Sequence, residues 1–187
     1  MILTDREIEI ALERRQISIE PRPPREALSS TSIDLTLADT FAEWLPRHGL
    51  PIRPGARGYV YSEIARELQR RVKRNQYTLS PRAFVLAWTA ERVSIPVNSR
   101  LAARVEGKSS LARLGVGIHI TAPTVHSGFE GQIQLEMFNF GPNPIVLDAG
   151  MRVCQLIFEQ TVGTPEKGYH GSFAKQAPGK RKRTRTR

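Results

Sequence analysis

A short turn in the middle of the chain gathers side chains that are suited to binding phosphate. It contains Gly107, Lys108, Ser109, Ser110 and Arg113. A glycine turn exposes backbone N–H groups, hydroxyls donate hydrogen bonds, and lysine and arginine supply the positive charge that a polyphosphate needs. The same residue types also occur in ordinary surface turns, and the upstream glycine of a P-loop is absent. Taken alone, the spacing therefore favours an ordinary turn.

A carboxylate follows on a segment with the alternation of a strand, residues 132–138. Side chains alternate between the two faces of a strand, so Ile133, Leu135 and Met137 share the core side and Glu136 lies on the opposite face. A carboxylate on such a face is usually just solvated. If the face lines a pocket, the same group is suited to general acid and base work. The spacing does not choose between these two interpretations.

The metal-binding residue types are scattered. His48, His119, His126 and His170 show neither a His-x-His pattern nor an i, i+4 pair, and Cys154 is the single cysteine. A zinc deaminase needs a triad of His and Cys ligands beside a Glu, so the sequence predicts no zinc site. One cysteine excludes an internal disulfide, and apolar neighbours indicate a reduced, packed thiol. We therefore expect a cytoplasmic protein.

The net charge of +10 is concentrated at the end of the chain. The last eight residues, 180–187, carry six of the 28 basic side chains, which leaves residues 1–179 with 22 basic against 18 acidic groups. We expect 180–187 to be a disordered, solvated basic tail, and a nucleic-acid contact is the less favoured reading. No stretch of about 18 apolar residues exists and the first residues are acidic, which predicts neither a membrane span nor a signal peptide.

The elements expected around these side chains are mainly strands within one domain. Thr4 and Glu7 form a capping-box pattern that predicts a helix up to Arg15, and 62–73 has the spacing of a second helix. Further short strands, separated by Gly and Pro turns, are expected at 33–37, 84–90, 101–105, 116–121, 132–138, 145–147 and 153–158. Such a succession predicts a β-sandwich or barrel.

Several of these segments together resemble the dCTP deaminase family of the trimeric dUTPase-like superfamily. They are LTDREIEIALERRQISIEPRPP, SIDLTLADTF and GKSSLARLG, followed by HITA, GFEGQIQLEMFNFG and GMRVCQLIFE. The resemblance implies a distorted β jelly-roll with a short N-terminal helix, assembled as a homotrimer with active sites shared at subunit interfaces. It implies a single domain over 1–179, in which 161–179 is a mobile C-terminal arm.

The activity that the resemblance implies is hydrolysis of dCTP to dUTP and ammonia without zinc. Glu136 would activate the water, and Ser109 and Arg113 would support the reaction. Mg²⁺ is implied as well, bound through the triphosphate. The positions implied to bind the nucleotide are Lys108, Ser109, Ser110, Leu111, Ala112 and Arg113 in the turn, Ala122 through its carbonyl, His126 at the sugar, Gln134, Leu135 and Glu136 at the pyrimidine, and Tyr169 and Gln176 in the arm.

Two positions depart from the family pattern. His126, followed by Ser127 and Gly128, stands where the family commonly carries an Asp that contacts the sugar and, in dUTPases, helps to activate water. Ser172 stands at the position that resembles a triphosphate-binding lysine. Three hypotheses stay open: a dCTP deaminase, a bifunctional dCTP deaminase and dUTPase that releases dUMP and diphosphate, and a non-catalytic nucleotide-binding relative. The loss of the Asp counts more against dUTPase activity than against deamination.

Overall fold

The structure is a computed structural model, and it describes residues 1–46, 49 and 51–169. The helices are α1 (Asp5–Glu13), α2 (Tyr61–Leu68) and α3 (Ser109–Ala112), with short 3-10 turns η1 (Arg25–Ala27) and η2 (Val97–Ser99). The strands are β1 (Ser18–Glu20), β2 (Leu28–Ser29), β3 (Ser32–Trp44), β4 (Gln69–Lys73), β5 (Gln76–Leu79), β6 (Phe84–Ser94), β7 (Leu101–Gly107), β8 (Val116–Gly117), β9 (Thr124–Val125), β10 (Glu130–Asn139), β11 (Ile145–Asp148) and β12 (Arg152–Gln160).

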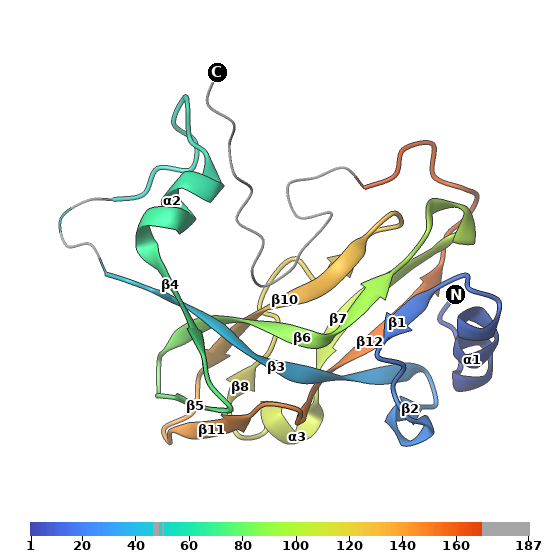
Figure 1. The fold of residues 1–187 in the computed structure, drawn as a ribbon, viewed down its shortest axis with the longest axis horizontal. Helices are drawn as coiled ribbons and strands as arrows, with labels where there is room; N and C mark the ends of the chain where they lie inside the picture. The colour runs from blue at the N-terminus through green and yellow to red at the C-terminus, as the bar shows by residue number, and fades with distance from the viewer. Residues whose placement is uncertain (47–48, 50, 170–187) are drawn as a thin grey trace.

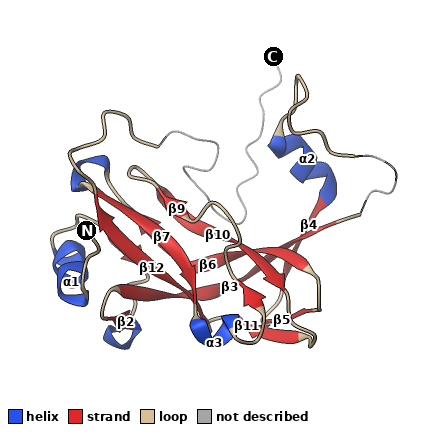
Figure 2. Ribbon diagram, turned by 180° about the vertical axis from the view of Figure 1, so that it is seen from behind, coloured by secondary structure: helices blue, strands red, loops and turns tan. Residues whose placement is uncertain are grey.

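A ten-stranded sheet dominates the described residues (Figure 1). Its main path is β8-β10-β6-β3-β12-β7-β9, and β1, β2 and β4 pair at its margins. A second sheet consists of β11 and β5. Figures 1 and 2 place α1 and α2 at opposite ends of this curled sheet. The expectation of a mainly β fold with a short N-terminal helix is therefore confirmed.

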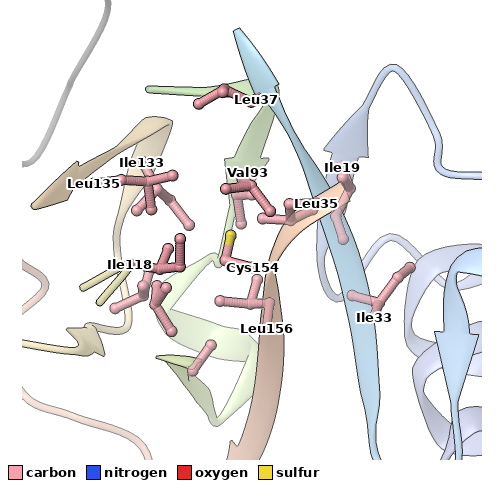
Figure 3. Close-up of a cluster of buried hydrophobic side chains, with 14 of the residues drawn as sticks. Ile19, Ile33, Leu35, Leu37, Val93, Ile118, Ile133, Leu135, Cys154 and Leu156 are labelled. Carbon is pink, nitrogen blue, oxygen red and sulfur yellow. The ribbon is translucent and has the colours of Figure 1, made fainter. Parts of the chain in front are cut away.

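The core lies inside the curl, where apolar side chains from distant strands meet. Figure 3 shows Ile133 and Leu135 of β10 in one cluster with Cys154 and Leu156 of β12. Their alternation with more exposed neighbours follows the two-residue period that the sequence predicts for strands with one buried face. Burial of this apolar surface is the main force that closes the sheet on itself.

The N-terminal helix forms for the expected reason but with different contacts. Ile8 and Ala11 are its buried residues, at the spacing of one helical face. The hydroxyl of Thr4 donates to the carboxylate of Glu7, and it makes no bond to a backbone N–H of the first turn. The helix ends at Glu13, two residues before the predicted Arg15. The capping-box pattern thus located the helix start, although the Thr4 hydroxyl does not bond to the backbone of the first turn.

Two sequence expectations are wrong in their bounds. The helix expected over 62–73 ends at Leu68, because β4 leaves it to pair with the outer end of β3. Arg70 of β4 is 2.7 Å from Glu43 of β3, a contact that fixes this pairing. The strand expected over 116–121 stops at Gly117. Residues 118–121 instead leave the sheet.

Within the described residues, no helix is long and apolar enough to cross a membrane.

Candidate active site

The strand β10 presents Glu136 as its sequence predicts. Ile133, Leu135 and Met137 are buried, whereas Gln134 and Glu136 on the opposite face are half-buried. Because the Leu135 side chain lies in the core, only its backbone is available to a ligand. Gln134 and Glu136 share one face, with a spacing that suits adjacent contacts to one planar base.

An irregularity in the neighbouring strand lies directly before this pair. The register of β10 against β6 shifts between Gln132 and Gln134. The Thr89 hydroxyl accepts a hydrogen bond from the Ile133 backbone N–H at 3.0 Å and so satisfies a donor that the ladder leaves over. Bulges of this kind bend a strand and re-aim its side chains. The extra residues lie on β6, between Trp88 and Arg92, so the bend is in β6 opposite Ile133.

Thr121 holds one oxygen of the Glu136 carboxylate. Its backbone N–H donates to Oε2 at 3.1 Å, and its hydroxyl donates to the same oxygen at 2.9 Å. Among the described residues, Oε1 has no hydrogen-bond partner. The carboxylate is thus oriented through one oxygen while the other is left able to accept a proton. Thr121 was not identified from the sequence, although it lies in the HITA segment.

The Ala122 carbonyl lies in the same turn and already accepts one hydrogen bond. Its partner is Nε2 of His119 at 3.1 Å, so this nitrogen carries the proton and donates. Nδ1 of His119 is buried and has no partner in the described part of the chain. Ala122 itself has a φ of 54°, in the left-handed region that is costly for a residue with a Cβ. A carbonyl oxygen has two lone pairs, so one stays available for a water.

The phosphate turn, residues 107–113, connects the end of β7 to the short helix α3. The Lys108 carbonyl accepts from the N–H groups of Leu111 and Ala112, which closes the helical turn. Leu111 is 9% exposed and packs into the core, so its side chain is an anchor. Ser109, Ser110, Ala112 and Arg113 are exposed. The turn therefore presents two hydroxyls and a guanidinium on a fixed base.

Lys108 does not point outward with these groups. Its Nζ lies 2.5 Å from Oδ2 of Asp34 in β3, and that carboxylate is buried. Asp34 was not singled out from the sequence. A single charged residue between Ile33 and Leu35, in a strand of core residues, was the available signal that a partner must exist.

The phosphate turn and Glu136 are not joined within one chain. Among the described residues, no hydrogen bond or ion pair links Glu136 to Ser109 or to Arg113. The structure therefore brings together Glu136, Thr121 and Ala122 as one group and Ser109, Ser110 and Arg113 as another.

An aromatic pair lies beside the turn that carries the departure from the family pattern. The rings of His126 and Tyr169 have centroids 5.0 Å apart, and the Tyr169 N–H donates to the Ser127 carbonyl at 3.0 Å. Both rings line a cavity of about 330 Å³ together with Lys167. The start of the arm thus packs on this turn. Gln176, Ser172 and the basic tail lie outside the described residues.

Exposed apolar side chains surround the end of β10 that carries Glu136. This apolar patch consists of the exposed Phe84, Leu114, Ile120 and Phe140 and the half-buried Phe138. Phe138 pairs with Phe84 across the strands, and its ring is 4.5 Å from that of Phe140. Phe140 is 65% exposed, which is unusual for a large apolar side chain. A patch of this kind commonly marks an interaction surface.

Comparisons with known proteins agree on one family. The profile of a family described as dCTP deaminase-like matches residues 2–161. A dCTP deaminase of Rhodospirillum rubrum is 34% identical over 175 residues, which cover 92% of this chain and 89% of that protein. An enzyme of Aquifex aeolicus named dCTP deaminase, dUMP-forming, is 37% identical over 176 residues, covering 94% and 91%.

Solved structures show the same fold. A 2'-deoxycytidine 5'-triphosphate deaminase from Agrobacterium tumefaciens superposes with a TM-score of 0.61 at 22% identity, over 84% of this chain and 47% of that one. A variant of the phage 80alpha dUTPase superposes with a TM-score of 0.51 at 12% identity, over 83% and 96%. At these identities the likeness concerns the fold alone.

Proposed function

This chain belongs to the dCTP deaminase-like family, and we propose that it hydrolyses dCTP to dUTP and ammonia. The observation that carries the proposal is the Glu136 carboxylate, held through Oε2 by Thr121 with Oε1 left without a partner in the described residues. Deamination needs one group that first accepts a proton and later returns it. A carboxylate oriented through one oxygen is suited to both steps.

The reaction begins when a water next to Glu136 transfers a proton to Oε1 and attacks C4 of cytosine. The second lone pair of the Ala122 carbonyl accepts a hydrogen bond from that water and orients it. Glu136 passes this proton to N3 of the ring, then takes the second proton from the new C4 hydroxyl and delivers it to the amino group, so that the C4–N bond breaks and ammonia leaves. The carboxylate is regenerated, so protons and electrons balance over the cycle.

The triphosphate is assigned to the exposed groups of the phosphate turn. The hydroxyls of Ser109 and Ser110 donate to phosphate oxygens, and Arg113 supplies the charge. We propose Mg²⁺ as the counterion, bound by phosphate oxygens and water, since Mg²⁺ usually keeps several waters when it binds a nucleotide. Among the described residues no three His, Cys, Asp or Glu side chains gather to hold a metal.

We propose further that the active site is completed by a second copy of the chain in a homotrimer. Two observations support this arrangement: among the described residues no hydrogen bond or ion pair joins Arg113 or Ser109 to Glu136, and the apolar patch lies next to Glu136 on β10. A covered patch would bring the phosphate turn of one copy to the carboxylate of the next. A cytoplasmic location stays a prediction.

Mixing two inactive variants tests the shared site. When Glu136→Gln and Arg113→Ala chains are mixed in equal amounts and reassemble at random, the whole population of trimers should regain about a quarter of the wild-type activity, because about a quarter of all sites then pair two intact residues. Each variant alone stays inactive. If both residues of a site came from one chain, the mixture would be as inactive as its components.

The names of two relatives suggest a second candidate function. The Aquifex aeolicus protein and a 38% identical protein of Methanobrevibacter smithii are both called dUMP-forming. Release of dUMP requires a second water to attack a phosphate. Here the exposed His126 replaces the Asp that the family commonly carries at that turn. An imidazole lacks the negative charge with which a carboxylate activates water, so we favour the deaminase.

Chromatography of the products separates the two functions. The purified chain is incubated with dCTP and, separately, with dUTP in the presence of Mg²⁺. We expect dUTP and ammonia from dCTP in equal amounts and no dUMP from either nucleotide. The appearance of dUMP and diphosphate would establish the bifunctional enzyme, and bound but unaltered dCTP would establish a non-catalytic relative.

A further inference from the structure

The ion pair between Lys108 and Asp34 crosses the sheet beneath the phosphate turn. Lys108 follows directly on β7, and Asp34 lies on β3, with β12 between these two strands. The register confirms the geometry, because Gly107 and Asp34 pair with the adjacent residues Cys154 and Gln155 of β12. The lysine side chain therefore extends over a whole strand to reach its partner. It ties the second residue of the phosphate turn to Asp34, which lies 74 positions away in sequence.

The surroundings of the pair favour its persistence. The side chains of Asp34 and Lys108 are only 10% and 25% exposed, respectively. The other cation near Asp34 is Arg152, whose Nε is 3.9 Å away and whose Nη1 donates to the Glu26 carbonyl. If Lys108 turned outward to bind a phosphate, the buried Asp34 carboxylate would keep only this longer contact. An uncompensated buried charge is strongly destabilising, so such a movement is unfavourable.

A second buried carboxylate lies on the neighbouring strand of the sheet. Glu91 of β6 is 4% exposed and accepts hydrogen bonds from the Thr36 N–H at 2.9 Å and from its hydroxyl at 2.7 Å. Cys154 lies close enough to Glu91, Asp34 and Lys108 for all three charges to act on its thiol.

We propose that Asp34 is a positioning residue of the active site, which binds Lys108, fixes the start of the phosphate turn and thereby places Ser109 and Arg113. In this arrangement Lys108 contributes to the shape of the turn, and Arg113 supplies the phosphate-binding charge. The inference rests on the proposed function in its assignment of Ser109 and Arg113, but the ordering of the turn can be measured without turnover.

Steady-state kinetics of Asp34→Asn and Lys108→Met distinguish positioning from direct phosphate binding. If the pair positions the turn, both variants lower kcat by about tenfold, and the double variant is no worse than either single one, because all three break the same contact. If Lys108 binds phosphate itself, Lys108→Met raises KM and leaves kcat unchanged. Asp34→Asn would then free the ammonium group and lower KM. Lys108→Arg retains the charge and should restore kcat.

Amide hydrogen exchange provides the readout that does not depend on activity. Asp34→Asn and Lys108→Met should each accelerate exchange at residues 109–113. Asp39→Asn is the matched control, since Asp39 lies on the same strand and pairs with Lys73 at 3.5 Å, but on the exposed surface. Unchanged exchange at 109–113 in both variants would overturn the inference even if the wild-type enzyme turned out to lack deaminase activity. Absence of wild-type turnover alone would refute only the proposed function.

Discussion

Gly128→Ala should detach the start of the arm from the turn that carries His126. The φ of Gly128 is +91°, and a Cβ there would lie 2.7 Å from the backbone nitrogen of Tyr169. That nitrogen donates to the Ser127 carbonyl, and the Tyr169 ring contacts the ring of His126. Since the close atom is backbone, no side-chain rotation relieves the contact. Residues 168–169 must move away.

The size of the expected effect on KM follows from the two contacts that Tyr169 loses. The hydrogen bond contributes about 1 kcal/mol and the ring contact about another 1 kcal/mol. A total of about 2 kcal/mol corresponds to a factor of about 30 in the equilibrium between docked and undocked arm. If the arm closes over the nucleotide, KM for dCTP should rise by up to this factor, with a smaller effect on kcat.

Backbone strain must be separated from the loss of the arm contact. Any L-residue at a positive φ costs about 1–2 kcal/mol, which lowers the melting temperature whatever the surroundings. Gly150→Ala is a matched control, because Gly150 has a φ of +85° and its Cβ would meet nothing within 4 Å. Both variants should lose similar stability, but only Gly128→Ala should raise KM and hasten tryptic cleavage at Lys167. Equal KM values for the two variants would refute the reasoning.

Two further predictions concern Glu136 and the buried thiol. Thr121→Val removes the hydroxyl that donates to Glu136 at 2.9 Å but keeps the backbone donor, so kcat should fall by about tenfold. The control Thr78→Val, on the exposed face of β5, should leave kcat unchanged. An unaltered kcat in Thr121→Val would show that the hydroxyl does not orient the carboxylate. Burial, with the nearby Glu91 and Asp34 carboxylates, raises the pKa of the Cys154 thiol well above its usual range. The folded state therefore favours the neutral thiol, and its contribution to stability is complete below the unfolded pKa and lost above it. Relative to Cys154→Ala, the wild type should lose about 1.4 kcal/mol of unfolding free energy per pH unit above about pH 8.5, as measured by urea denaturation. If the unfolding free energies of the two proteins followed parallel curves against pH, this prediction would be contradicted.

Local patterns in the sequence were sufficient for the strand that carries the candidate carboxylate. The alternation of Ile133, Leu135 and Met137 fixed the face of Glu136, because one side of β10 is buried and a shift by one residue would expose all three. Boundaries were less predictable where tertiary pairing competes with local preference. The segment that follows Leu68 has helical spacing, yet the edge of β3 offers it backbone partners and β4 forms instead.

Contacts between segments that are distant in the sequence could not be predicted from local patterns. From the sequence, Lys108 could not be distinguished from any other lysine in a glycine turn. Only the fold shows that it pairs with Asp34. The role of Thr121 depends equally on residues 118–121 leaving the sheet toward β10. Charge in the middle of a core strand, as at Asp34, indicates that a partner exists but does not identify it.

Ammonia release from dCTP by Glu136→Gln tests the account most directly. The amide has the shape of the carboxylate but cannot accept the proton of the attacking water. Turnover should therefore fall by about 10³-fold, while the oligomeric mass and the melting temperature stay those of the wild type. Glu130→Gln on the same strand, where Glu130 pairs with Arg92 at 2.7 Å, should keep full activity. Sustained ammonia release by Glu136→Gln would contradict the assignment of Glu136 as the acid and base of the reaction.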